Sequence, residues 1–158
     1  MTALAAYLQT HLAGSRAGVD LFSRSAKGQL DHEIGVALDE IRREVADERT
    51  QLQQIMSSLD VDENLVRSTA ARIGERIARL KPNGSLLHRT PLTDLVEVEA
   101  LRIAVSGKQA GWESLVAIAD LVPQLDLDQL EQLVAQGKLQ LERLGELHAV
   151  VARRALTP

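Results

Sequence analysis

Apolar side chains recur at alternating spacings of three and four residues through most of this chain, which is the pattern of amphipathic α-helices. Glycines and prolines interrupt the pattern and separate the helical segments from one another. The pattern predicts helices over residues 3–26, 31–59, 61–80, 91–121 and 126–156. The segment 61–80 is shorter than the other four, and no segment alternates with the period of a strand.

Local signals mark several helix ends. Gly28 follows the first apolar stripe, as expected for the residue after a helix C-terminus. Thr90 stands directly before a proline, which is the arrangement of an N-cap residue and the first helical position. Asp60 and Glu63 have the spacing of a capping box, so Asp60 is expected to begin the short helix. By the same argument Asp126 begins the last helix.

Two glycines, Gly14 and Gly18, lie one helical turn apart on the apolar stripe of the first segment. A glycine inside a helix costs about 1 kcal/mol relative to alanine. We interpret these two glycines as positions where a neighbouring helix approaches closely.

The connection between the segments 31–59 and 91–121 decides the topology. It contains the short predicted helix, which at 1.5 Å per residue covers roughly 25–30 Å and could cross the whole bundle. The two flanking helices would then run parallel, as in a ferritin-like four-helix bundle with one long crossover and a fifth, shorter helix in it. An up-down-up-down bundle, with the short helix across one end, is the alternative.

Composition indicates one all-α domain covering residues 1–158. Apolar residues make up 45% of the chain and aromatic residues 2%, so the residues that favour strands are nearly absent. The common residues are good helix formers, and the chain is long enough to bury its own core. There is no cysteine, which excludes disulfides and thiolate metal sites.

Charge and hydropathy narrow the classes of partner. The net charge is −4, which argues against a nucleic-acid binder because such proteins usually have a basic face. The N-terminal residues lack the pattern of a signal peptide, and no apolar run approaches the length of a membrane span. We therefore expect a cytoplasmic protein that binds neither nucleic acid nor membrane.

Three stretches carry a resemblance to known proteins: residues 11–14 (His-Leu-Ala-Gly), residues 80–84 (Leu-Lys-Pro-Asn-Gly), and residues 90–108, which include Val-Glu-Val-Glu at 96–99 and end in Gly-Lys. On these stretches the chain resembles a group of uncharacterised small actinobacterial proteins with a ferritin-like helical bundle. The resemblance extends over most of the chain. It implies a fold and no particular chemistry.

Ferritin-like bundles that bind metal use a Glu from each of two helices and a Glu-x-x-His from each of the other two. This chain contains no Glu-x-x-His, and the segment 3–26 contains no Glu. At the corresponding spacing, the segment 31–59 has Glu44 followed by Asp47, and the segment 126–156 has Glu142 followed by Gly145. We therefore predict no metal site and no cofactor.

Polar residues on the apolar stripes are the candidate site. Folding the first two helices together at their turn places His11 near the level of Glu44 and Glu48. If the second and third long helices run parallel, Lys108 lies as far along its helix as Glu48 does. The candidate buried polar cluster is therefore His11, Glu44, Glu48 and Lys108.

A second candidate pair is Glu97 with His148, nearer one end of the bundle. Either group could form a polar pocket for a metal, a small ligand or a reactive carboxylate. Alternatively, the groups only satisfy one another, with the Lys108 ammonium extended to water. The sharpest hypothesis is a buried Glu48–Lys108 ion pair, in which the ammonium supplies the positive charge that metal ions supply in metal-binding bundles.

Two functions follow from these observations. The first is a non-catalytic helical bundle that acts through protein–protein contacts, as a homo-oligomer or with a protein partner. The alternative is a ferritin-like protein that binds a metal or a small ligand at an atypical, ligand-poor site. Metal analysis of untagged protein distinguishes the two.

Overall fold

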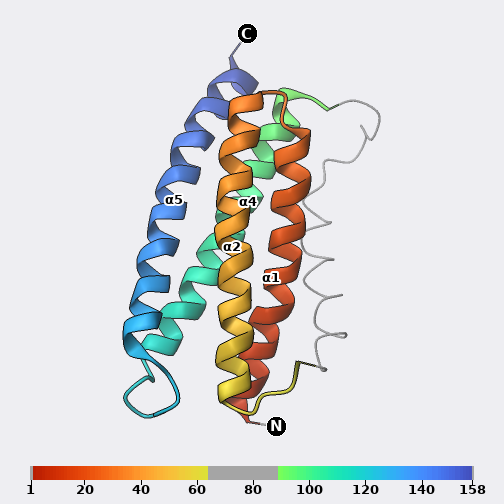
Figure 1. The fold of residues 1–158 in the computed structure, drawn as a ribbon. Coiled ribbons are helices and arrows are strands. Elements are labelled where there is room, and N and C mark those ends of the chain that lie inside the picture. Colours follow the sequence, from red (N-terminus) through yellow and green to blue (C-terminus); the bar gives the residue numbers. More distant parts are fainter. Residues whose placement is uncertain (1, 64–88, 158) are drawn as a thin grey trace.

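The computed structural model of the chain is a bundle of long helices with roughly aligned axes (Figure 1). It describes residues 2–63 and 89–157, and within these residues it contains helices and no strand. The helices are α1 (Ala3–Gly28), α2 (His32–Ser58), α4 (Pro91–Val116) and α5 (Leu127–Leu156). The predicted all-α class is confirmed for this part of the chain. None of these helices has the length and apolar character that a membrane span requires.

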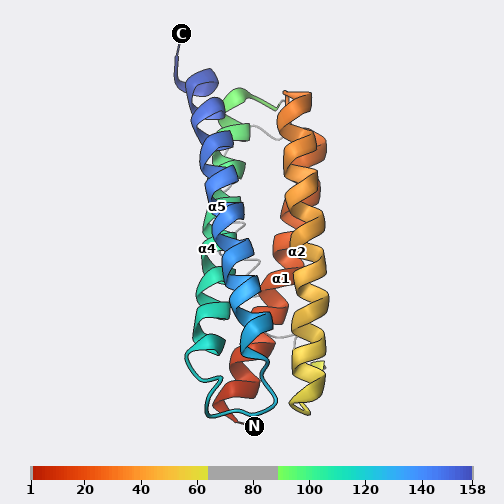
Figure 2. The ribbon, with the colours of Figure 1, turned by 60° about the vertical axis from the view of Figure 1, so that its left-hand side comes forward.

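The helices pair as two antiparallel hairpins, α1 with α2 and α4 with α5. Beyond these pairs, α1 packs against α4, and α2 touches α5 over a smaller area. Figures 1 and 2 show that α2 and α4 start at the same end of the bundle and run in the same direction. That direction was predicted from the long connection, whereas an up-down-up-down bundle would reverse α4. The predicted helix at 61–80 lies outside the described residues, apart from its first three.

Each of the four helices begins at a side-chain cap. In α5, Asp126 Oδ1 accepts a hydrogen bond from the backbone N–H of Gln129 over 3.1 Å. In α4, Thr90 forms a reciprocal capping box with Thr93. These bonds satisfy backbone donors that have no partner within the helix. The predicted N-caps Thr90 and Asp126 are therefore confirmed.

Asp60 ends α2 and does not begin a new helix, which corrects the prediction. Its φ is 53°, in the left-handed region, whereas an N-cap residue has extended backbone. The N–H of Val61 donates to the carbonyl of Met56 over 2.9 Å, and the N–H of Asp60 donates to Ser57 over 3.2 Å. These two bonds form a Schellman motif, with Asp60 at the position usually occupied by glycine.

The helix α4 ends at Val116, five residues before the predicted end at 121. Residues 117–121 continue as turns in which backbone N–H groups bond to carbonyls three residues back, such as Ile118 to Leu115 and Leu121 to Ile118. Such bonds commonly tighten the chain after a helix C-terminus. The apolar pattern persists through the turns because Ile118, Ala119 and Val122 still pack against the core.

The apolar core is divided into two clusters along the bundle axis. One includes Phe22, Leu38, Ile41, Leu101 and Leu144, and the other includes Leu12, Met56, Trp112, Leu115 and Leu130. Between the clusters every helix contributes polar or glycine residues: Ser15 and Gly18 on α1, Glu48 on α2, Lys108 and Gln109 on α4, and Gly137 and Gln140 on α5. We call this level the polar layer, and it is where the candidate site lies.

Candidate functional site

The carboxylate of Glu48 is the centre of the polar layer. Its side chain is 1% exposed, and three donors contact it. Lys108 Nζ forms an ion pair with Oε2, and Trp112 Nε1 donates to the same oxygen over 3.1 Å. Gln140 Nε2 donates to Oε1 over 2.7 Å. Both carboxylate oxygens are therefore satisfied, as the burial of a charged group requires.

Glu44 lies one turn before Glu48 on α2 and extends the network toward the surface. The amide of Gln140 also donates to Glu44 Oε2 over 3.1 Å, so one side chain of α5 bridges two carboxylates of α2. Arg143 Nη1 donates to Glu44 Oε1 over 2.5 Å. These contacts join α2 to α5, which otherwise touch only slightly.

Lys108 is slightly exposed to solvent, with 15% of its side chain accessible. Burial lowers the pKa of its ammonium, while the charges of Glu48 and then Glu44 oppose that shift. Of the predicted cluster, Glu44, Glu48 and Lys108 come together.

The fourth predicted member, His11, lies on α1 and makes no polar contact with the other three in the described structure. Its ring packs on Gly111 of α4, where an added Cβ would lie 2.8 Å from a ring atom. It also contacts the ring of Tyr7, with centroids 4.5 Å apart. Burial lowers the pKa of His11, which favours the neutral imidazole.

Two contributors to the site, Trp112 as a donor and Gln140, were not predicted from the sequence. As the one tryptophan of the chain, Trp112 is expected from its sequence to be a core plug or an interface anchor. The apolar pattern of residues 126–156 favours Leu141, the next residue, over Gln140 on the buried stripe of α5. A signal was present, since Gly137, Gln140 and Leu144 also have the spacing of one helical face.

The buried amides of Gln109 and Gln140 each leave an oxygen without a hydrogen-bond partner. Gln109 Nε2 donates to Glu113 over 2.9 Å, and Gln140 Nε2 donates to two carboxylates, so the orientation of both amides is fixed by acids. Gln109 Oε1 lies only 2.0 Å from the position that a Cβ on Gly137 would occupy. Gly137 thus makes room for a polar side chain of α4.

The predicted pairing of Glu97 with His148 is wrong, because each residue has another partner. Glu97 accepts from Arg89 Nη2 over 2.5 Å, and His148 Nε2 lies 3.2 Å from Glu99. At the start of α4 the buried face runs through Asp94, Leu95 and Val98, so Glu97, which was predicted to lie on the apolar stripe, is only partly buried.

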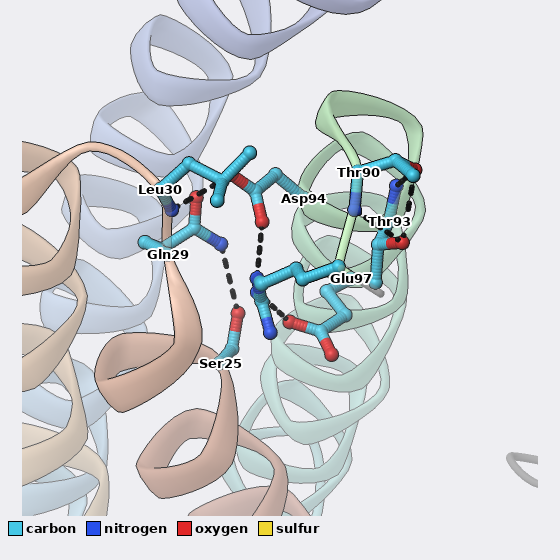
Figure 3. A network of polar contacts seen from close by, with 8 residues as sticks. Ser25, Gln29, Leu30, Thr90, Thr93, Asp94 and Glu97 are labelled. Carbon is cyan, nitrogen blue, oxygen red and sulfur yellow. Dashed lines mark hydrogen bonds and ion pairs between the residues drawn. The ribbon is translucent and has the colours of Figure 1, made fainter. Parts of the chain in front are cut away.

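Asp94 is the buried residue of a second polar network at the start of α4 (Figure 3). Its Oδ2 accepts from the backbone N–H of Leu30 over 3.0 Å, and its Oδ1 accepts from Arg89 Nε over 2.5 Å. The same arginine holds Glu97, so the network joins the α1–α2 turn to α4. All of these contacts are internal, and we assign this network a structural role.

A cavity of about 300 Å³ lies between α1 and α4 and has part of α2 in its wall. Most of its lining is apolar or small, including Phe22, Leu52, Ala104, Leu115 and Gly111, and its polar side includes His11, Glu48, Arg49 and Lys108. Gly18 is buried on this wall, yet an added Cβ would meet no atom within 4 Å in the part of the chain that the structure describes. The predicted role of Gly18 in close helix approach is therefore wrong, and the glycine borders open space.

Within residues 2–63 and 89–157, no group of three or more histidine, aspartate or glutamate side chains is placed to hold a metal ion. At the polar layer the cation that contacts Glu48 is the ammonium of Lys108. Comparisons of the chain with protein-family models, with curated proteins and with solved structures find no match. Function must therefore be inferred from the residues themselves.

Proposed function

We propose that this protein binds a small, mainly apolar molecule in the cavity between α1 and α4. The observation that carries the proposal is Gly18, a buried glycine in the middle of a helix whose missing side chain would meet open space. Glycine there costs about 1 kcal/mol relative to alanine, and protein cores are normally close-packed. A helix that accepts this cost beside a space that no described residue fills favours a bound molecule as the occupant.

The lining supports the same function. Binding pockets for small molecules have volumes from about 300 Å³ upward, with mostly apolar walls and a few polar groups that orient the ligand. The cavity has that volume and that distribution, with Glu48 and Lys108 from the polar layer on one side. The Glu48–Lys108 pair would then orient a ligand. It would also close the side of the cavity that faces the polar layer.

Binding can be tested with the neutral fluorophore N-phenyl-1-naphthylamine. We expect saturable binding by the wild-type protein, with quenching of Trp112, which lines the cavity. Gly18→Leu should abolish binding because its side chain fills the cavity. Gly107→Leu, on the α4 wall, should weaken it, since a Cβ there also meets open space.

Gly145→Leu is the matched control. Gly145 lies on α5, away from the cavity, and an added Cβ there likewise meets no atom within 4 Å. This variant should bind the probe as the wild type does. Absence of binding by the wild type, or binding that survives Gly18→Leu in the folded protein, would contradict the proposal.

Self-association, the first hypothesis from the sequence, stays a prediction. The large apolar side chains that are exposed are Leu30, Val36, Leu92, Ile103, Leu121, Leu127, Leu139, Val150 and Leu156. They are distributed over three helices and two connections, and single exposed apolar residues are common on monomers. Sedimentation equilibrium would reveal a dimer if one forms.

We also propose that the bundle is ferritin-like and that the protein is not an enzyme. The parallel α2 and α4, joined by a long connection, support the first statement. The engagement of Glu48 by three donors supports the second, because these donors stabilise the ionised carboxylate and weaken it as a base. Metal analysis of untagged protein tests the predicted absence of an iron or manganese pair.

A further inference from the structure

Arg49 is the one residue on the cavity wall whose charge is unmatched in the described structure. It follows Glu48 on α2 and is partly buried. Its Nη1 donates to Gln53 over 3.0 Å, while its Nε is buried without a hydrogen-bond partner. Gln53 is neutral, so this contact leaves the positive charge of the guanidinium uncompensated.

The other polar groups on the wall do not supply the missing anion. Among the described residues that line the cavity, Glu48 is the only acidic one, and its two oxygens already accept from Lys108, Trp112 and Gln140. The charges of Glu48 and Lys108 cancel. His11 adds no charge at neutral pH because burial lowers its pKa. The wall therefore carries one net positive charge and one buried N–H donor that lacks an acceptor.

We propose that the ligand is an apolar monocarboxylic acid whose carboxylate pairs with Arg49. The inference rests on the proposed ligand-binding function and specifies its ligand class. A guanidinium is planar and matches a carboxylate with two parallel hydrogen bonds, so a carboxylate supplies both the negative charge and the acceptor for Nε. The apolar part of the acid occupies the space bounded by Phe22, Ala104 and Leu115.

The size of the cavity sets the length of the acid. At roughly 30 Å³ per water molecule in the liquid, 300 Å³ corresponds to about ten waters, which is room for a medium-length chain. Decanoic acid is a suitable probe, and decanol is its neutral counterpart with nearly the same shape. Comparing the two separates the contribution of charge from that of the apolar chain.

The experiment measures displacement of N-phenyl-1-naphthylamine by decanoate and by decanol at pH 7.5. We expect the wild type to bind decanoate about tenfold more tightly than decanol, or better, as expected for a hydrogen bond to a charged group. Arg49→Met should remove this preference, so that decanoate no longer binds more tightly than decanol. Arg16→Met, which removes an exposed arginine of α1, is the control for net charge and should keep the preference.

Different results contradict the ligand-binding function and the assignment of the carboxylate to Arg49. If neither compound displaces the probe and the probe itself does not bind, the proposed ligand-binding function fails. If both compounds bind equally, or if Arg49→Met retains the preference for decanoate, ligand binding stands and the assignment to Arg49 is overturned. Should Arg49→Met fail to fold by circular dichroism, Arg49→Gln serves in its place, because it keeps a donor for Gln53 and lacks the charge.

Discussion

The indole N–H of Trp112 donates to the same carboxylate oxygen of Glu48 that forms the ion pair with Lys108. Trp112 is the only tryptophan of the chain, and it lies both on the polar layer and on the cavity wall. Its fluorescence therefore reports on the ion pair, on cavity occupancy and on unfolding without any added label.

The Glu48–Lys108 pair should show strong coupling in a double-mutant cycle. Lys108→Met leaves a buried carboxylate without its cation, which should lower the free energy of unfolding by about 3–5 kcal/mol. Glu48→Leu should cost a similar amount because it leaves the ammonium unpaired. The double variant should recover much of the loss, since two apolar side chains of similar volume replace the pair. Urea denaturation followed by Trp112 fluorescence measures all four proteins.

An exposed ion pair on the same helix serves as the control. Asp39 and Arg42 are in contact on α2, with 34% and 28% of their side chains exposed. Arg42→Met should cost less than about 1 kcal/mol, because surface pairs contribute little. If the losses from Glu48→Leu and Lys108→Met simply add, the two residues do not act as a buried pair.

The sequence was sufficient to predict helix number in the described part, the direction of α4 and the meeting of Glu48 with Lys108. These follow from the 3.6-residue period and from a long connection that can span the bundle. The period cannot decide between adjacent residues, because both Gln140 and Leu141 fall within one apolar stripe. Whether Leu141 or Gln140 is buried on α5, and whether Glu97 or Asp94 is buried on α4, depends on how the helices pack against one another.

Helix ends were predicted less well, for a different reason. The pair Asp60 and Glu63 has the spacing of a capping box, but the backbone at Asp60 is left-handed and closes the preceding helix. The spacing of side chains along the sequence carries no information on the backbone angle φ at Asp60. Partners such as Arg89 for Glu97 were missed because an ion pair depends on where loop residues lie in space.

Asp60→Gly should stabilise the protein by up to about 1 kcal/mol. Glycine adopts a left-handed backbone without steric cost, and it is the usual residue at this position of a Schellman motif. Asp60→Val should destabilise it, because a β-branched residue is strained at φ of 53°. Thermal unfolding gives the order Gly, Asp, Val from most to least stable, and equal stability of all three variants would refute the assignment.

Two glycines of α5 should respond in opposite ways to alanine. Gly145→Ala should raise the free energy of unfolding by about 1 kcal/mol, since the new Cβ meets no neighbour and alanine favours the helix. Gly137→Ala should lower it, because the Cβ would lie 2.0 Å from Gln109 Oε1 in a buried site. Adding Gln109→Ala to Gly137→Ala should remove that clash. Urea midpoints of the three variants and the wild type provide the comparison.

Stability should fall in mild acid in part because of His11. Burial lowers its pKa in the folded protein, so the unfolded chain binds a proton at His11 more readily. The contribution is therefore fully present above the unfolded pKa of about 6.5 and decreases as the pH falls below it toward the folded pKa. His11→Gln should show a shallower loss of stability between about pH 6.5 and 5 than the wild type.

The exposed His32, at the start of α2, gives the control for this effect. His32→Gln should retain the pH dependence of the wild type over the same interval. NMR titration of the His11 ring should independently give a pKa below that of a histidine in an unfolded peptide. A normal titration of His11 would exclude it as a source of the acid sensitivity.

The polar layer also restricts how the helices can slide along one another. A shift of α4 by one helical turn, about 5.4 Å, toward the C-terminus of α2 would move Lys108 to the level of the apolar Leu52 and leave Glu48 without its cation. A core of leucines alone would tolerate such a shift, because successive apolar layers are nearly equivalent. No short turn joins α2 to α4, so the Glu48–Lys108 pair sets the register of the two parallel helices together with the bond from Leu30 to Asp94 at the start of α4.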